Sequence, residues 1–511
     1  MTFESQLALV PLAPLLAALA IAGTRLFRLS AGDAAERPTA RMATGGVAVS
    51  LLLMLALDAA ALLKGLPHRV RFGTWFASGR FELPISFALD PLSLSLGTLV
   101  ALIAFLALRF SVNYMHREAG FHRFFFAMSL FSAGMLLIVL AGNAALCFVG
   151  WELAGVSSYL LIGYSQQSEI ATDNAVRAFV TNRIGDAGFL VGLAAAFYWI
   201  GSLEWREIGA GAVRLETLPA GVMVLGFVIA ASAKSAQVPF APWVARALEG
   251  PTPSSAIFYG SLMVHAGVYL LIRLEPVLDH SLAVMGLVAG LGAATVLYGW
   301  LSGLVQTDVK SALVFATITQ VGLMFLECGL GWFDLAAWHL ALHASWRAYQ
   351  FLLAPSYMHL VGGPAKPAPG WLSGRQWLYT AALQRFWLEA AGDWLLLRPT
   401  RGLGHDMNAF DRQVVDRVTG SAEPARHLPT GPERETEPEA VARGYGSAGR
   451  LLEIAAARLA RFEEHLLLQG AEGRLARALV QAANYLRAVE ALLERPRYLL
   501  LLVMATFAVI L

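Results

Sequence analysis

Apolar stretches long enough to cross a lipid bilayer recur from the beginning of the chain to about residue 360. A membrane-spanning helix needs about 20 predominantly apolar residues, and about eleven stretches approach that length. We expect them near residues 7–24, 43–63, 91–112, 124–141, 143–164, 176–201, 219–237, 253–274, 282–305, 311–330 and 335–359. A further apolar stretch covers residues 498–511. The pattern predicts an all-α polytopic membrane protein.

The first apolar stretch is predicted to be a retained helix rather than a secretory signal. No Lys or Arg precedes it, whereas Arg25 and Arg28 follow it. With Arg37 and Arg41 these arginines place the first connection in the cytoplasm by the positive-inside rule. In the next connection, alternating polar and apolar residues over 70–80 predict a small β-hairpin on the opposite face.

The seventh apolar stretch is interrupted just after Lys234. Pro239 and Pro242 follow the lysine, and the run Gly-Pro-Thr-Pro at 250–253 precedes the next apolar stretch. Proline removes a backbone donor and breaks a helix. In a bilayer, such backbone is tolerated only where protein or a water-filled cavity satisfies it. A helix broken beside a lysine therefore indicates an ion path.

The pattern divides the chain into four regions. Residues 1–90 hold two spans and the hairpin, and residues 91–360 are expected to form a proton-conducting core. Residues 361–449 are expected to form a partner-facing segment and a flexible linker, and residues 450–511 a long amphipathic helix with a terminal span. Apolar residues recur at helical spacing over 450–494. That helix can lie along the membrane surface or belong to a short coiled coil or bundle.

Composition agrees with a bilayer environment and excludes several functions. Hydrophobic residues make up 57% of the chain and charged residues 14%, and the mean hydropathy is +0.58. A net charge of +2 gives no basis for nucleic-acid binding. Cys147 and Cys328 lie in apolar segments far from a second sulfur ligand, so we expect packing roles and no metal site in this chain.

Ionisable residues inside the apolar stretches are the candidate functional groups. Such a residue costs about 2.5–3.5 kcal/mol on insertion scales, so its presence suggests a function. Glu152, Lys234 and His265 lie in three different stretches. Carboxylate, amine and imidazole groups connected by water can transfer protons. The competing interpretations are a static buried pair of Glu152 with Lys234 and a structural hydrogen bond of His265 between helices.

Two further groups have helical spacing. His339, His343 and Arg347 follow each other at four-residue intervals and would line one stripe of a helix. Paired histidines at this spacing also bind zinc in metalloproteases, but no Glu at the required place and no third ligand accompanies them. Arg183 and Asp186 share a helical face and are predicted to form a structural ion pair. No phosphate loop, nucleophile constellation or metal cluster supports a free-standing enzyme.

Around these residues the sequence resembles the antiporter-like proton-pumping subunits of respiratory complex I, especially the NuoL type. The matching segments are FVGWELAGVSSYLLIGY at 148–164, AFVTNRIGDAGFL at 178–190, AKSAQVPFAPWVARALEGPTPSSA at 233–256, TDVKSALVFATITQVGLM at 307–324 and HLALHASWRAYQFL at 339–352. The resemblance implies that Glu152, Lys234, His339 and His343 belong to a proton path, and Lys310 also matches a family position.

The sequence departs from that family at three places. Arg347 stands where a lysine is usual, and arginine keeps its proton, so it can supply a fixed charge but hardly carry protons. Tyr259 stands where another histidine is common, with His265 nearby. After residue 353 the family continues into a second broken helix, whereas this sequence changes to a Gly-rich and Pro-rich segment at 362–370. The second inverted repeat is therefore expected to be truncated.

The shortened body and the APSYMHL sequence at 354–360 are similar to the DabB family, the membrane subunits of bacterial inorganic-carbon pumps. That resemblance implies an inner-membrane subunit that conducts protons to drive a DabA-like zinc-binding partner, with no cofactor in this chain. The alternatives are a proton-translocating L-type subunit of an NADH–quinone oxidoreductase and a subunit of a multi-component cation/proton antiporter. Co-purifying subunits would distinguish them.

Overall fold

The computed structural model describes residues 3–27, 35–65, 69–79, 81–360 and 367–410. All eleven apolar stretches expected up to residue 360 form helical segments in it. The predicted amphipathic helix and terminal span at 450–511 lie outside the described residues, as does most of the predicted linker. The chain divides into two compact units, residues 1–394 and residues 395–511.

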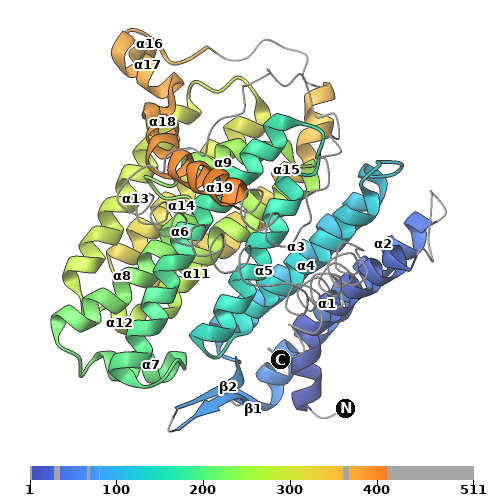
Figure 1. The fold of residues 1–511 in the computed structure, drawn as a ribbon, viewed down its shortest axis with the longest axis vertical. Helices are drawn as coiled ribbons and strands as arrows, with labels where there is room; N and C mark the ends of the chain where they lie inside the picture. Colours follow the sequence, from blue (N-terminus) through green and yellow to red (C-terminus); the bar gives the residue numbers. More distant parts are fainter. Residues whose placement is uncertain (1–2, 28–34, 66–68, 80, 361–366, 411–511) are drawn as a thin grey trace, which may run out of the picture. The chain divides into compact units, whose positions relative to one another are not determined.

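The first unit is a bundle of long helices (Figure 1). The longer helices are α1 (Phe3–Leu26), α2 (Glu36–Lys64), α3 (Pro91–Tyr114), α4 (Phe121–Leu140), α5 (Ala144–Ile162), α6 (Glu169–Ile200), α8 (Thr217–Lys234), α13 (Leu282–Gly303), α14 (Val309–Gly329) and α15 (Phe333–Leu360). The shorter ones are α7 (Trp205–Ala212), α9 (Pro242–Arg246), α10 (Thr252–Ser255), α11 (Ala266–Arg273), α12 (Glu275–Leu278), α16 (Gly370–Ser373), α17 (Gln376–Leu383) and α18 (Leu388–Gly392). α19 (Arg398–Phe410) belongs to the second unit.

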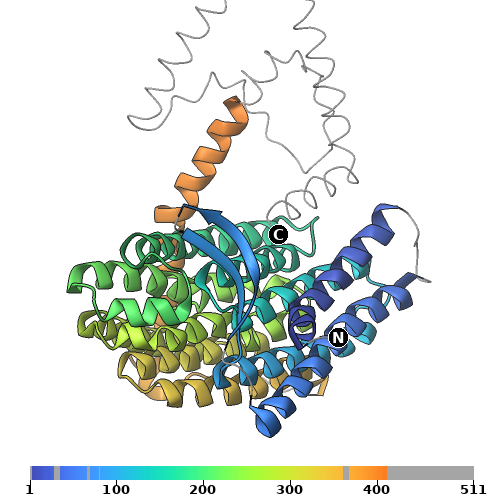
Figure 2. The same ribbon diagram turned by 90° about the horizontal axis from the view of Figure 1, so that it is seen from below.

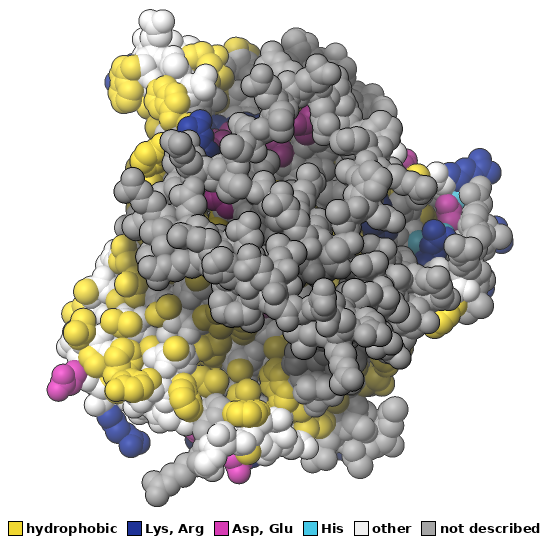
Figure 3. All heavy atoms as spheres, in the orientation of Figure 1, with side chains coloured by type: hydrophobic (Ala, Val, Ile, Leu, Met, Phe, Trp, Pro, Cys, Tyr) yellow, Lys and Arg dark blue, Asp and Glu magenta, His cyan; other side chains and the backbone are white. Residues whose placement is uncertain are grey.

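Ten helical segments of the described chain are long and apolar enough to cross a membrane. One of them, Thr252–Arg273, combines α10 and α11 with π-helical and 3₁₀ turns between them, and it is buried throughout. α15 is the eleventh expected span and is not among the ten. Its length suffices, but Asp334, the two histidines and Arg347 make it more polar than the others. Hydrophobic side chains gather on the visible surface around α6, α7 and α8 (Figure 3).

The predicted β-hairpin is present between α2 and α3. β1 (Arg69–Ser78) pairs antiparallel with β2 (Phe81–Ala88), and the register shifts twice along the ladder. Figure 2 shows the hairpin in front of the helix ends. Asn143 ties it to the start of α5 by donating to the Pro84 carbonyl at 2.8 Å, while Ser86 donates to Glu204 at 2.8 Å. The hairpin therefore belongs to the same end of the bundle as the α4–α5 and α6–α7 connections.

The predicted interruption after Lys234 is also present. α8 ends at this lysine, and the chain resumes a helical conformation at α9. Ser235 Oγ donates to the Val264 carbonyl at 2.6 Å, and Val238 N donates to Thr295 Oγ1 at 3.0 Å. The backbone freed by the break is thus held partly by protein groups of neighbouring segments.

Residues 370–394, beyond the last long helix, pack on the long helices of the first unit. Trp371 stacks on Trp300 of α13 with ring centres 5.5 Å apart, and Phe386 contacts Tyr298 of the same helix. Arg177 of α6 forms an ion pair with Asp393. This segment therefore forms part of the same compact unit as the membrane helices.

Candidate functional site

Glu152 lies in a charged cluster between α5 and α6. Its carboxylate pairs with Arg183, and Arg183 also approaches Asp186 Oδ2 at 2.9 Å. Asp186 is buried and accepts a hydrogen bond from the Trp151 indole at 2.9 Å. The predicted Arg183–Asp186 pair is therefore present, and Glu152 enlarges it to three charges. The sequence analysis did not single out Trp151 as part of this cluster.

Lys234 lies at the broken end of α8 and is 1% exposed. Its ammonium donates to the Trp151 carbonyl at 3.3 Å and sits 5.0 Å from the centre of the Trp151 ring. The static Glu152–Lys234 pair considered from the sequence does not occur within 4.0 Å in the described chain; Arg183 takes the place beside Glu152. Glu152, Asp186 and Arg183 still act on the lysine through space. Among the residues that the structure describes, the lysine thus has charged neighbours but no direct counter-ion.

A second polar group joins the Thr252–Arg273 span to α15. His265 Nε2 and His343 Nδ1 are 2.9 Å apart, and Arg347 Nε lies 3.4 Å from His343 Nε2. All three side chains are buried. One imidazole nitrogen must donate to the other, so the protonation of either ring depends on its partner. Four-residue spacing placed His343 beside Arg347, but the tertiary fold brought His265 to them.

His339 has a different set of partners from its neighbour His343. Its Nδ1 lies 2.9 Å from Glu327 Oε1, and its Nε2 lies 2.9 Å from Gln320 Oε1. Both partners belong to α14. The two histidine rings are 6.2 Å apart between centres. Sequence analysis missed Glu327 and Gln320, although Glu327 is an ionisable residue inside an apolar helix, the signal used for Glu152.

Two residues singled out from the sequence have other surroundings. Lys310 is half-buried in the first turn of α14, where Asp308 caps the helix by accepting from Ser311 N at 2.8 Å. No hydrogen bond or ion pair within the described residues joins Lys310 to either polar group. Tyr259 is buried and donates to the Ala247 carbonyl, which holds the segment after the break against its own helix.

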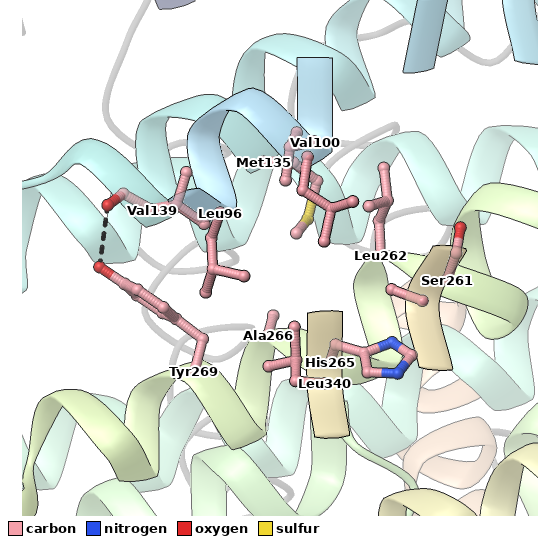
Figure 4. Close-up of a pocket in the computed structure, with 12 residues that line it drawn as sticks. Leu96, Val100, Met135, Val139, Ser261, Leu262, His265, Ala266, Tyr269 and Leu340 are labelled. Atoms are coloured by element: carbon pink, nitrogen blue, oxygen red, sulfur yellow. Dashed lines mark hydrogen bonds between the residues drawn. The ribbon is translucent and has the colours of Figure 1, made fainter. Parts of the chain in front are cut away.

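A small cavity lies beside His265 (Figure 4). Its lining is largely apolar and includes Leu96, Val100, Met135 and Leu340, and Tyr269 at its edge donates to the Val139 carbonyl at 3.0 Å. Small apolar cavities hold no water because a water molecule finds too few hydrogen-bond partners there. The polar contacts of His265 therefore run toward His343 and away from this cavity.

Two family descriptions match the chain. Residues 141–362 match the transmembrane family "NADH:quinone oxidoreductase/Mrp antiporter". Residues 75–125 match the N-terminal family of "NADH-Ubiquinone oxidoreductase (complex I), chain 5". The larger match includes both polar groups described above. It ends before the segment 370–394.

Curated relatives agree with these matches. The chain is 38% identical over 323 residues to NADH-quinone oxidoreductase subunit L of Mycobacterium tuberculosis, which covers 63% of this chain and 50% of the relative. It is 35% identical over 365 residues to NAD(P)H-quinone oxidoreductase subunit 5 from the chloroplast of Nephroselmis olivacea, covering 70% and 56%. The chain thus spans about half the length of the curated relatives it matches.

Solved structures show the same architecture. The Mrp complex from Dietzia sp. DQ12-45-1b matches with a TM-score of 0.60 and 26% identity, covering 71% of this chain and 38% of that chain. An archaeal membrane-bound sulfane sulfur reductase matches in fold with the same TM-score, 20% identity and coverage of 70% and 72%. Homology to bacterial subunit L and the ten candidate spans agree with the expected inner-membrane location. Residues 141–362 therefore form an antiporter-like membrane domain similar to those of the complex I/Mrp type, and the chain resembles multi-span membrane subunits of that kind.

Proposed function

We propose that this chain conducts protons as one subunit of a larger membrane complex. The observation that carries the proposal is the pair of buried polar groups, one centred on Lys234 and the other on His265 and His343, inside membrane-spanning segments. Keeping such groups in a bilayer is costly, and they mark ion and proton paths in membrane proteins. Ser235 and Val264, which are hydrogen-bonded at 2.6 Å, connect the backbone next to the two groups.

Each group contains side chains that can exchange protons. Glu152, Lys234 and the histidines can gain or lose a proton, whereas Arg183 and Arg347 supply fixed charge. A shift of Lys234 relative to Trp151 and Asp186 would change its affinity for a proton, which is the basis of a switch. Water between the two groups would complete the relay.

The complex in which the chain works is proposed from its relatives. Their names favour an oxidoreductase or antiporter complex, with this chain as its L-type proton-translocating subunit. The second candidate is an inorganic-carbon pump with a DabA-like zinc-binding partner. One observation supports this second candidate. The segment after residue 362 lies outside the family match, yet residues 370–394 belong to the same compact unit as the matched helices.

Two variants test the proton path. In proteoliposomes that contain the full chain with its co-purifying subunits, Lys234→Ala and Glu152→Gln should each lower proton flux at least about tenfold, because each removes a proton-exchanging group. The assembled complex should be recovered in wild-type amounts. Full flux in either variant would remove that residue from the path.

Purification from the native membrane tests the context. Flavin and iron–sulfur subunits would support the oxidoreductase, and several antiporter-like subunits without redox centres would support an antiporter. A single large zinc-binding partner would instead support the carbon pump. Recovery of the chain as a lone monomer that conducts no protons would contradict the proposed function in every form.

A further inference from the structure

Glu389 joins the segment after the family match to the region of the broken helix. Its Oε2 accepts from Arg246 Nε at 3.0 Å and from Arg246 Nη2 at 2.5 Å, while Oε1 accepts from Arg385. Burial would raise the pKa of this carboxyl, but the hydrogen bonds and charges of the two arginines hold it below its ordinary value. Glu389 is therefore an anion that bridges α9 and the turn before α18.

Arg246 is the last residue of α9, and α9 is tied to the backbone beside Lys234. The buried Trp243 indole donates to the Ala233 carbonyl at 2.9 Å. Ala233 directly precedes the lysine. Arg246 is thus connected to the residue before Lys234 through one short helix and one hydrogen bond.

The turn that carries Arg385 has an unusual backbone. Arg385, Phe386 and Trp387 have φ angles of 51°, 56° and 54°, a left-handed conformation that residues with side chains rarely adopt. Such conformations persist only where surrounding contacts impose them. Here Phe386 packs on Tyr298, and the Arg385 guanidinium lies 5.4 Å from the centre of the Phe315 ring. The turn therefore packs on α13 and α14. Its Arg385 contacts Glu389, which also binds Arg246 of α9.

We propose that Glu389 is a positioning residue for Lys234, acting through Arg246 and Trp243, so that movement of the segment 370–394 controls proton transfer at the broken helix. The inference rests on the proposed proton conduction. It assigns a coupling role to a segment that lies outside the matched family. A partner subunit that contacts this segment would thereby act on the proton path without touching Lys234.

The test compares the pH dependence of proton flux in proteoliposomes of the full chain with its co-purifying subunits. Glu389→Gln and Arg246→Gln should each shift the pH midpoint in the same direction, by roughly half a unit to one and a half units. The double variant should show the shift of either single variant, because both break one connection. Glu389→Asp and Arg246→Lys, which keep the charges, should stay near wild type.

The groups that act on Lys234 are unchanged in all these variants. They are Asp186 and Arg183 of α6 and Glu152 of α5. Among the other segments packed on α8, α13 carries Tyr298 but no charged residue, and α12 carries Glu275. The span ending with α11 carries Tyr259, His265, Tyr269 and Arg273. The Arg177–Asp393 ion pair keeps the segment attached when Glu389 is changed.

A remote ion pair provides the matched control. Arg71 and Glu82 of the hairpin are 2.6 Å apart, and Arg71→Gln and Glu82→Gln remove the same charges without contact to α9. Their pH midpoints should equal that of wild type. Unchanged midpoints in Glu389→Gln and Arg246→Gln, with flux present in wild type, would overturn the coupling alone. A wild-type complex without flux would overturn the proposed function itself.

Discussion

Arg347 is the arginine packed against the paired histidines. It is 6% exposed and lies against His343, which in turn contacts His265. Arginine remains protonated under almost all conditions, whereas lysine can lose its proton when buried. Arg347 therefore places a permanent positive charge beside the paired histidines. We propose that it acts in the proton path as a fixed charge.

This role predicts different effects for two substitutions of Arg347. Arg347→Lys should keep proton flux within about threefold of wild type, because a charge remains beside His343, whereas Arg347→Ala should lower flux about tenfold or more. Flux in proteoliposomes, normalised to assembled protein, provides the measurement. Equal loss in both variants would argue for the geometry of the guanidinium over its charge.

The helices around the broken segment approach each other through small residues. A Cβ added at Gly188 of α6 would lie 2.9 Å from the Gly226 carbonyl of α8. A Cβ at Gly267 of α11 would lie 2.2 Å from the Ala231 carbonyl and 2.3 Å from Ser235 Oγ. Glycine allows backbones to pack this closely in membrane proteins. Close contacts with α6 and α11 thus restrict the part of α8 that leads to Lys234.

Gly267→Ala should destabilise the protein by about 1–3 kcal/mol, because the added methyl group must push backbone away from backbone. The thermal melting of the purified chain, followed by intrinsic tryptophan fluorescence, measures the effect. Gly286→Ala in α13 is the matched control, since no atom lies within 4 Å of its added Cβ. A melting temperature of Gly267→Ala equal to that of the control would contradict the close packing of α8 and α11.

At the scale of the whole molecule, hydrogen bonds show which connections between helices lie at the same end of the bundle. Gly142 N donates to the Ser86 carbonyl and Ala144 N to the Leu203 carbonyl, which joins the hairpin to the α4–α5 and α6–α7 connections. At the other end, Glu36 contacts His116 at 2.7 Å, and Gly120 N donates to the Tyr164 hydroxyl. Because Arg37 and Arg41 lie near this second end, the positive-inside rule predicts that it faces the cytoplasm.

Membrane-impermeant thiol labelling checks this orientation. In a chain whose buried Cys147 and Cys328 are replaced by Ala, Ser78→Cys should react from the outside of intact cells, and Ala119→Cys only after the membrane is opened. Both positions are exposed, so differences in burial do not explain a difference in labelling. Reaction of both cysteines from the same side would contradict the assignment of ends.

The sequence by itself determined the features that depend on local pattern. Runs of apolar residues set the helical spans because a bilayer leaves the backbone no partner except itself. Proline after Lys234 ended α8, and alternation predicted the hairpin. The spacing of His343 and Arg347 placed them on one stripe of α15. Each of these follows from residues within a few turns of one another.

Only the tertiary structure decided which distant residues meet. It paired Glu152 with Arg183 instead of Lys234, His265 with His343, and His339 with Glu327 and Gln320. It also brought Glu389 to Arg246, 143 positions away along the chain. Helical periodicity specifies the face that a side chain occupies, but the neighbour on that face depends on the packing of other helices. The partners of the ionisable residues, and hence their chemistry, were therefore beyond the reach of local pattern.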